Sequence, residues 1–259
     1  MQSMPTVAYL SDIHLEFYPD GTNPVVDVAW PTGDILCLAG DIGHPETPAY
    51  AGFLAECSRL FQYVFLIAGN HEYYQTSAHP PKTMHETDET IRDVCRRFHN
   101  VHFLSNTSFH VPEFDLHVLG TTLWTGGDVR PADRFVYSDF RRIDDLRRGE
   151  SMQNLHEASV RFLREHLPQH RHDGSTVLVL THHLPSYELI APLYRHSELN
   201  HLFATDLDDL FRDYTIHHWV CGHSHRPTQT TIGDTKVWMN PIGYPGENAD
   251  VCWTRSFEL

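Results

Sequence analysis

Short apolar runs, each followed by glycine or a polar side chain, recur along the first part of the chain. They occupy residues 7–11, 34–39 and 63–68, and runs of this length are typical of buried strands. Residues 48–61 instead carry apolar side chains at helical spacing, which predicts a crossover helix before the third run. A strand, a helix and a further strand in succession predict a parallel sheet, and therefore an α/β fold.

Shorter apolar stretches follow after residue 100. They predict strands at residues 101–104, 108–111, 116–119, 176–180, 217–221, 228–232, 236–240 and 251–257. We expect the first three of these to begin a second sheet. The predicted helices are residues 86–98, 151–167 and 207–214.

Aspartate, asparagine and histidine side chains come at the ends of five predicted strands. Asp12, Asp41 and Asn70 follow the first three strands and are 29 residues apart each time (41 − 12 and 70 − 41). Successive parallel strands bring their ends to one edge of a sheet, where the ligand sites of α/β proteins form. The full candidate set is Asp12, His14, Asp41, Asn70, His71, His182, His223 and His225.

Composition and charge limit the class of protein. The chain has 259 residues, 41% of them hydrophobic, which is enough for one domain spanning residues 1–259. Its formal net charge of −15 disfavours long nucleic acid, whose binding depends on Lys and Arg neutralising phosphates. A small phosphorylated substrate remains compatible with this charge, because bound divalent metals reverse the sign locally.

Targeting signals and disulfides are not expected. No apolar run approaches the roughly 20 residues that span a bilayer, and the first residues carry no basic segment typical of a signal peptide. The five cysteines are scattered without a C-x-x-C pair, which fits reduced thiols rather than a disulfide framework. We therefore expect a cytoplasmic protein with no membrane partner, and no sequence feature indicates its oligomeric state.

The candidate residues offer carboxylate, amide and imidazole groups and no thiolate. Such mixed oxygen and nitrogen ligands suit divalent Mn, Fe, Zn, Co or Ni, of which we favour Mn and Fe. A carboxylate such as Asp41 can bridge two ions at the roughly 3.5–4 Å separation of two-metal hydrolysis. The strand-end residues therefore indicate two divalent metals and a hydrolytic reaction.

The ordered blocks D-x-H, G-D, G-N-H-E, H and G-H-x-H resemble the calcineurin-like metallophosphoesterase superfamily, from Thr6 to the C-terminus. The resemblance implies a four-layer α/β/β/α sandwich with the metals at the strand ends. It implies one metal held by Asp12, His14 and His225, a second metal held by Asn70, His182 and His223, and Asp41 as the bridge.

The same resemblance implies the catalytic roles. His71 looks like the family's non-ligand histidine, which serves as a general acid or stabilises the developing oxyanion. The expected nucleophile is a hydroxide that bridges the metals beside Asp41. We choose His182 as the ligand because it comes directly off its strand, and we expect His183 to meet solvent or substrate.

One position departs from the protein-phosphatase branch of the family. That branch places an aspartate three residues after the bridging aspartate to orient the catalytic histidine, and His44 stands there in this chain. The orienting carboxylate is therefore missing or supplied from elsewhere. This departure favours the phosphodiesterase-like branches, which act on small or nucleotide-type esters.

The sequence thus predicts a phosphodiesterase, with three alternatives: a phosphomonoesterase, a nuclease for short oligonucleotides, or a non-catalytic metal-bound scaffold. We expect the substrate to be decided by the loops 73–90, 125–150 and 186–205. Residues 126–150 are expected to be a charged loop in which an arginine either clamps a substrate phosphate or, as the simpler interpretation, forms a surface ion pair. The arginines concerned are Arg141, Arg142, Arg147 and Arg148.

Overall fold

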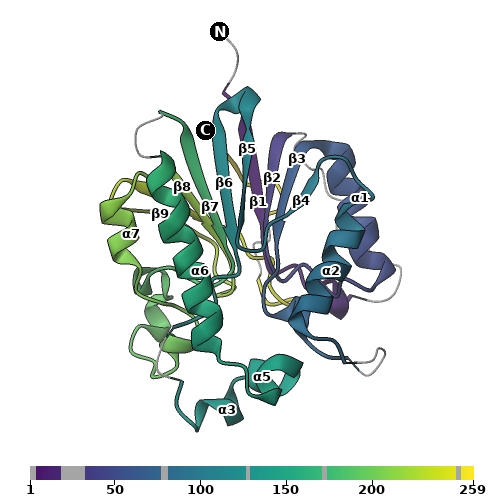
Figure 1. The fold of residues 1–259 in the computed structure, drawn as a ribbon, viewed down its shortest axis with the longest axis vertical. Coiled ribbons are helices and arrows are strands. Elements are labelled where there is room, and N and C mark those ends of the chain that lie inside the picture. Colours follow the sequence, from purple (N-terminus) through teal and green to yellow (C-terminus); the bar gives the residue numbers. More distant parts are fainter. Residues whose placement is uncertain (1–3, 19–32, 77–80, 127–128, 171–173, 249–251) are drawn as a thin grey trace.

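The computed structural model describes residues 4–18, 33–76, 81–126, 129–170, 174–248 and 252–259. Two sheets form its centre (Figure 1). The first has the strand order β11-β1-β2-β3-β4, and the second has the order β5-β6-β7-β8-β10-β9.

Both sheets are parallel at their centres. In the first, the parallel strands are β1 (Thr6–Leu10), β2 (Gly33–Ala39), β3 (Phe61–Ile67) and β4 (Val101–Phe103), and the antiparallel edge strand is β11 (Ser256–Glu258). In the second, the parallel strands are β6 (Leu116–Thr121), β7 (Thr176–Thr181), β8 (His218–Cys221) and β10 (Thr235–Met239), and the antiparallel edges are β5 (Thr107–Val111) and β9 (Thr228–Ile232). Within each sheet the parallel strands therefore end on the same edge.

Alternate residues of each central strand point into different hydrophobic layers. Ile35 and Cys37 of β2 belong to the core between the sheets, whereas Leu36 and Leu38 pack outward. The outer face of the first sheet is covered by α1 (Pro48–Leu60) and α2 (Met84–Cys95), and that of the second by α6 (Met152–His166) and α7 (Asp208–Asp213) (Figure 1). The predicted four-layer α/β/β/α arrangement is confirmed.

The bounds of α2 differ from the prediction of a helix over residues 86–98. The helix begins two residues earlier because Thr83 and Glu86 form a reciprocal capping box at its N-terminus. It ends at Cys95, and the next residues form a turn in which Phe98 donates its N–H to the carbonyl of Cys95.

Residues 126–150 correct the expectation of a solvated loop. Their described part contains three short helices: α3 (Asp133–Val136), α4 (Asp139–Arg142) and α5 (Asp144–Arg148). Each begins with an aspartate that is at most 1% exposed. Asp133 pairs with Arg130 and His201, and Asp144 pairs with arginines of its own helix, so these buried charges are compensated locally.

The final predicted strand, residues 251–257, is shorter in the structure. Val251 lies outside the described residues, a turn occupies Trp253 and Thr254, and the strand begins only at Ser256. Within the described ranges, no helix has both the length and the apolar character required to cross a bilayer.

Candidate metal centre

All eight candidate residues come together where the strands of both sheets end. Asp12 and His14 follow β1, Asp41 follows β2, and Asn70 and His71 follow β3. The second sheet contributes His182 after β7, and His223 and His225 after β8. Every member is buried except the partly exposed His225, whose side chain is 14% exposed.

One cluster is formed by Asp12, His14 and His225. Their potential ligand atoms all lie within 4.8 Å of one another. The Nε2 atoms of His14 and His225 are 3.1 Å apart, and Nε2 of His225 is 3.4 Å from Oδ1 of Asp12. These are the residues that the family resemblance assigns to one metal.

A second cluster contains Asn70, His182 and His223. Nε2 of His182 lies 3.0 Å from Oδ1 of Asn70 and 3.1 Å from Nδ1 of His223. Asp41 adjoins both clusters, because its Oδ2 is 3.5 Å from Nε2 of His182 and 3.9 Å from Nε2 of His14. The positions of all seven expected ligands are therefore compatible with two adjoining metal sites.

Histidines of both clusters have a hydrogen-bond acceptor at the outer ring nitrogen, which is the one that points away from the other cluster members. Nδ1 of His14 lies 3.2 Å from Oε1 of Glu16, and Nδ1 of His225 lies 2.7 Å from Oε2 of Glu247. Nδ1 of His182 donates to the carbonyl of Ala39 at 2.9 Å. Metal-ligating histidines commonly have such an outer acceptor, which fixes the ring and leaves the other nitrogen facing the metal.

Asn70 is oriented by a buried residue that sequence reasoning missed. Its Nδ2 donates to Oδ1 of Asp139 at 2.9 Å, so its Oδ1 faces His182. Tyr74 donates to the same carboxylate oxygen at 2.6 Å, and Tyr137 also hydrogen-bonds Asp139 while its hydroxyl lies 3.1 Å from Nε2 of His223. No sequence signal marked Asp139, because it stands in a stretch of charged and turn-forming residues.

Glu16 supplies the carboxylate that the sequence left unassigned. Its Oε1 lies 2.9 Å from Nδ1 of His71, and the same atom contacts His14. It stands in a single 3-10 turn, Leu15–Phe17, immediately after the D-x-H block. Its position two residues after His14 was the available signal, but its side-chain direction depends on that turn.

Glu72 ties two of the loops together. Its buried carboxylate accepts backbone N–H groups of Asp41 at 3.0 Å, Ile42 at 2.7 Å and Gly69 at 2.7 Å. Burial raises the pKa of Glu72 to about 7, against the lowering effect of these hydrogen bonds. Glu72 thereby fixes the position of Asp41 relative to the loop of Asn70.

Five candidate residues have a left-handed backbone. The φ values are 51° for Asp12, 55° for His14, 54° for Asp41, 68° for His223 and 49° for His225. Such conformations cost roughly 1–3 kcal/mol each in non-glycine residues and concentrate at functional sites. Backbone hydrogen bonds between neighbouring loops stabilise these conformations. The N–H of Asp12 donates to the carbonyl of Gly40, and the N–H of His14 donates to the carbonyl of Asp41, both at 3.0 Å.

His183 corrects a smaller expectation. It is fully buried rather than in contact with solvent, and its ring packs on Trp124 and His223. Its Nδ1 lies 3.3 Å from the carbonyl of Thr122. At the surface, the hairpin of β5 and β6 carries a further group of possible metal ligands: His110, Asp115 and His117.

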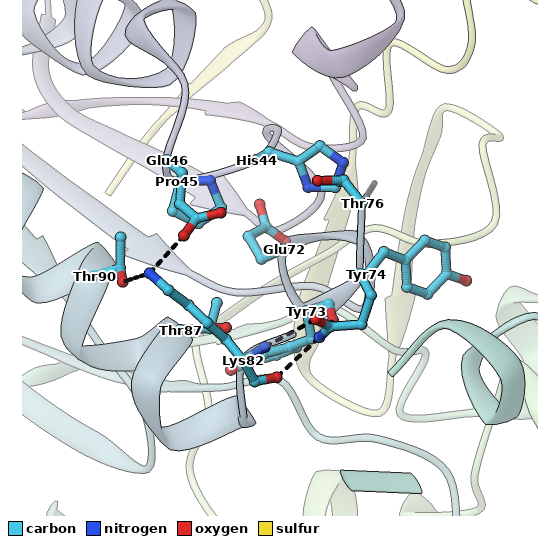
Figure 2. Close-up of a pocket in the computed structure, with 11 residues that line it drawn as sticks. His44, Pro45, Glu46, Glu72, Tyr73, Tyr74, Thr76, Lys82, Thr87 and Thr90 are labelled. Carbon is cyan, nitrogen blue, oxygen red and sulfur yellow. Dashed lines mark hydrogen bonds and ion pairs between the residues drawn. The ribbon is translucent and has the colours of Figure 1, made fainter. Parts of the chain in front are cut away.

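A cavity of about 490 Å³ opens onto the clusters. Its floor includes Asp41, Asn70, His71, His223 and His225, and its walls come from residues 136–138, residues 190–203 and the loop of Tyr244. A much smaller cavity of about 20 Å³ is lined in part by Glu72, and Lys82 contacts Glu46 and Thr90 there (Figure 2). That volume holds little more than a water molecule, and the cavity of about 490 Å³ is the candidate substrate site because it is lined by candidate residues of both clusters.

Comparisons with known proteins agree with this geometry. The family model for calcineurin-like phosphoesterases matches residues 5–227. An uncharacterized protein of Acanthamoeba polyphaga mimivirus is 25% identical over 264 residues, covering 94% of this chain and 93% of that protein.

Two solved structures share the fold. The phosphopantetheinyl hydrolase of Mycobacterium tuberculosis superposes with a TM-score of 0.73 at 19% identity, covering 99% of this chain and 97% of that one. A dimetal phosphatase from Danio rerio superposes with a TM-score of 0.52 at 14% identity, covering 92% and 87%. The chain therefore belongs to the calcineurin-like phosphoesterase family and is a phosphoester hydrolase.

Proposed function

We propose that this hydrolase is a dinuclear metal-dependent phosphodiesterase for small phosphoesters. The observation that carries the proposal is the pair of adjoining buried clusters that share Asp41, with their histidines held by outer nitrogens. A scaffold without catalytic function would have no need of that preorganisation, nor of five strained backbone positions.

The charges of the clusters fit divalent cations. Asp12, Asp41 and Glu72 are buried close together, Glu16 lies beside them with a side chain that is 9% exposed, and in the described part of the chain no lysine or arginine forms an ion pair with these four. Burial raises the pKa of Asp41, and the neighbouring charges of Glu72 and Asp12 add to this effect. Bound cations would remove this repulsion.

The proposed ligands are those that the sequence indicated, and we favour manganese or iron as the metals. Asp12, His14 and His225 would hold one ion, Asn70, His182 and His223 the other, and Asp41 would contact both. Bound at these residues, two divalent metals supply stabilisation of phosphoryl charge and activation of a water molecule for attack.

His71 is proposed as the catalytic histidine, with Glu16 as the residue that positions it. His71 lines the cavity, and Glu16 holds its Nδ1. Burial lowers the pKa of His71 to about 4, whereas the hydrogen bond to Glu16 opposes that shift. With the Nδ1 proton directed at Glu16, Nε2 is free to accept a proton, and the imidazolium so formed can donate it toward a leaving-group oxygen.

A diester is favoured over a monoester by the charge of the cavity lining. None of the described residues that line it is a lysine or an arginine. A monoester dianion would bring a second negative charge beside Asp41 and Glu247, and the described lining offers no lysine or arginine to meet it. The fold shared with phosphopantetheinyl hydrolase supports including phosphopantetheinyl esters among the first natural substrates assayed.

The test compares bis-p-nitrophenyl phosphate with p-nitrophenyl phosphate on manganese-reconstituted protein. We expect diester turnover to exceed monoester turnover, and Asp41→Asn to reduce it by about 100-fold or more. Asp115→Asn is the matched control, because Asp115 has a similar φ of 46° and a side chain that is 70% exposed. Dominant monoester turnover would identify a phosphatase instead, and no turnover with two metals bound would support the scaffold alternative.

A further inference from the structure

We propose that the substrate carries one bulky, uncharged and largely apolar ester group, which binds in the cavity between residues 136–138 and 190–203. This inference rests on the proposed phosphodiesterase function and adds the chemical class of the substrate. The substrate class is inferred from the side chains that form the walls of the cavity, not from those of its floor.

The walls facing the clusters are rich in apolar and aromatic side chains. They include Val136, Tyr137, Ile190, Tyr194, Leu199, Phe203 and Tyr244. Ile190 is only 6% exposed and forms a buried part of the wall, while Leu199 and Tyr244 are 39% and 41% exposed. A cavity with a polar reactive floor and apolar walls is typical of sites that bind a small molecule with a mixed surface.

Exposed large apolar side chains concentrate around this cavity. Val136, Tyr194, Leu199 and Tyr244 line it directly. The other exposed members in the described chain are Phe17, which packs on Tyr244, Phe135 and Tyr187, which adjoin the wall segments in sequence, Leu193, whose side chain is not part of the lining, and the distant Met4. Such a concentration of exposed apolar surface at one place marks a binding site.

The wall formed by residues 190–203 is preformed by its own hydrogen bonds. Nδ2 of Asn200 donates to the carbonyls of Tyr194 and Arg195 at 2.8 and 3.2 Å. The segment is anchored behind the second cluster, because Leu184 donates to the carbonyl of Phe203 at 3.1 Å. The apolar side chains therefore stand in place before a substrate binds, which lowers the entropic cost of binding.

The charge of the cavity lining supports the second part of the proposal, namely that the ester group is uncharged. The carboxylate side chains among the lining residues are those of Asp41 and Glu247, and the described lining contains no lysine or arginine. These carboxylates would repel a further phosphate on the ester group, and the described lining has no lysine or arginine to offset that repulsion. The walls therefore select for an uncharged group and against a polyphosphate.

The test uses p-nitrophenyl phosphodiesters that differ only in their second ester group: methyl, benzyl or 2-phosphoethyl. We expect kcat/KM for the benzyl diester to exceed that for the methyl diester by about tenfold or more, because a hydrophobic pocket discriminates by roughly this factor or more per added group. The 2-phosphoethyl diester should be the slowest of the three.

Two matched variants locate the effect. Leu199→Ser should lower the benzyl-to-methyl ratio of kcat/KM toward one, because Leu199 lines the cavity. Leu193→Ser should leave the ratio unchanged, because Leu193 is 84% exposed and is not among the lining residues. Both positions are exposed enough for the variants to fold.

The possible outcomes distinguish a failure of the proposed substrate class from a failure of the proposed phosphodiesterase function. Turnover of all three diesters with equal kcat/KM, or a preference for the 2-phosphoethyl diester, would overturn the substrate class and leave the phosphodiesterase intact. An equal loss of the ratio in both leucine variants would place the selectivity outside the cavity and overturn the proposal. Turnover of none of the diesters would remove the phosphodiesterase function, and the substrate class with it.

Discussion

At the residue scale, the contact of Glu16 with His71 places a carboxylate beside the proposed catalytic histidine, where the protein-phosphatase branch is expected to use an aspartate. The carboxylate comes from the 3-10 turn after β1 instead of from the position of His44. Because Oε1 of Glu16 also contacts His14, one side chain positions both a proposed metal ligand and the proposed catalytic histidine.

The Glu16→Gln variant tests this role. We expect kcat on bis-p-nitrophenyl phosphate to fall about 10–100-fold, as is usual when an outer partner of an active-site histidine is lost, while KM changes little. Glu56→Gln is the control, because Glu56 forms a surface ion pair with Arg59 on α1. An unchanged kcat with full metal content would show that Glu16 does not position His71.

Sequence alone could identify the candidate residues but not all of their partners. The eight candidates follow apolar strands in a fixed order, and strand ends converge in any parallel sheet. Glu16, Asp139 and Glu247 reach the clusters through turns and short helices, whose side-chain directions depend on tertiary contacts. The ligand and catalytic roles of the eight remain predictions.

At the scale of elements, the loops after β2 and β3 approach so closely that only glycine fits at position 69. A Cβ placed there would lie 2.2 Å from Oδ1 of Asp41 and 2.7 Å from the Asp41 nitrogen. Glycine at the end of the β3 run therefore has a packing reason in addition to a turn preference.

The Gly69→Ala variant should displace Asp41. We expect a loss of metal affinity and of diester turnover, with a decrease of about 1–3 kcal/mol in the free energy of unfolding from overpacking. Gly52→Ala is the matched control: a Cβ at this position of α1 meets nothing within 4 Å, so helix propensity should raise stability by about 0.5–1 kcal/mol. Wild-type turnover and metal affinity in Gly69→Ala would contradict the close-approach explanation.

Element prediction succeeded for the positions of the apolar strands, but residues 101–104 pair with β3 in the first sheet, whereas the sequence predicted that they begin the second sheet. It failed where side chains set the boundaries of helices. The strand over residues 228–232 and the core of each crossover helix were correct because periodicity reports burial directly. The helices α3, α4 and α5 were missed because each is only four or five residues long, which is too short to show an apolar periodicity, and each starts at a buried aspartate.

At the scale of the whole molecule, the stability of the second sheet depends on a neutral histidine. Nε1 of Trp238 donates to Nδ1 of His218 at 3.1 Å, and the imidazole stacks on Phe257 with a centroid distance of 4.5 Å. Burial, aided by the positive charges of Lys236 and His217, lowers the pKa of His218 to about 4.

This shift makes stability dependent on pH. Between about pH 6.5 and pH 4 the unfolded chain binds a proton at His218 that the folded chain does not, so the contribution is fully present above pH 6.5 and is lost as the pH falls. From pH 7 to pH 5 we expect wild type to lose about 2 kcal/mol more unfolding free energy than His218→Asn, measured by urea denaturation. An equal loss in both proteins would show that His218 titrates normally when folded.

The central claim is that two metals held at adjoining clusters make this fold a phosphodiesterase. The most direct measurement is a titration of chelator-treated protein with Mn²⁺, following turnover of bis-p-nitrophenyl phosphate against metal equivalents per chain. We predict that activity is absent after chelation and reaches its plateau at two equivalents. Activity that survives chelation, or a plateau at one equivalent, would contradict the dinuclear account.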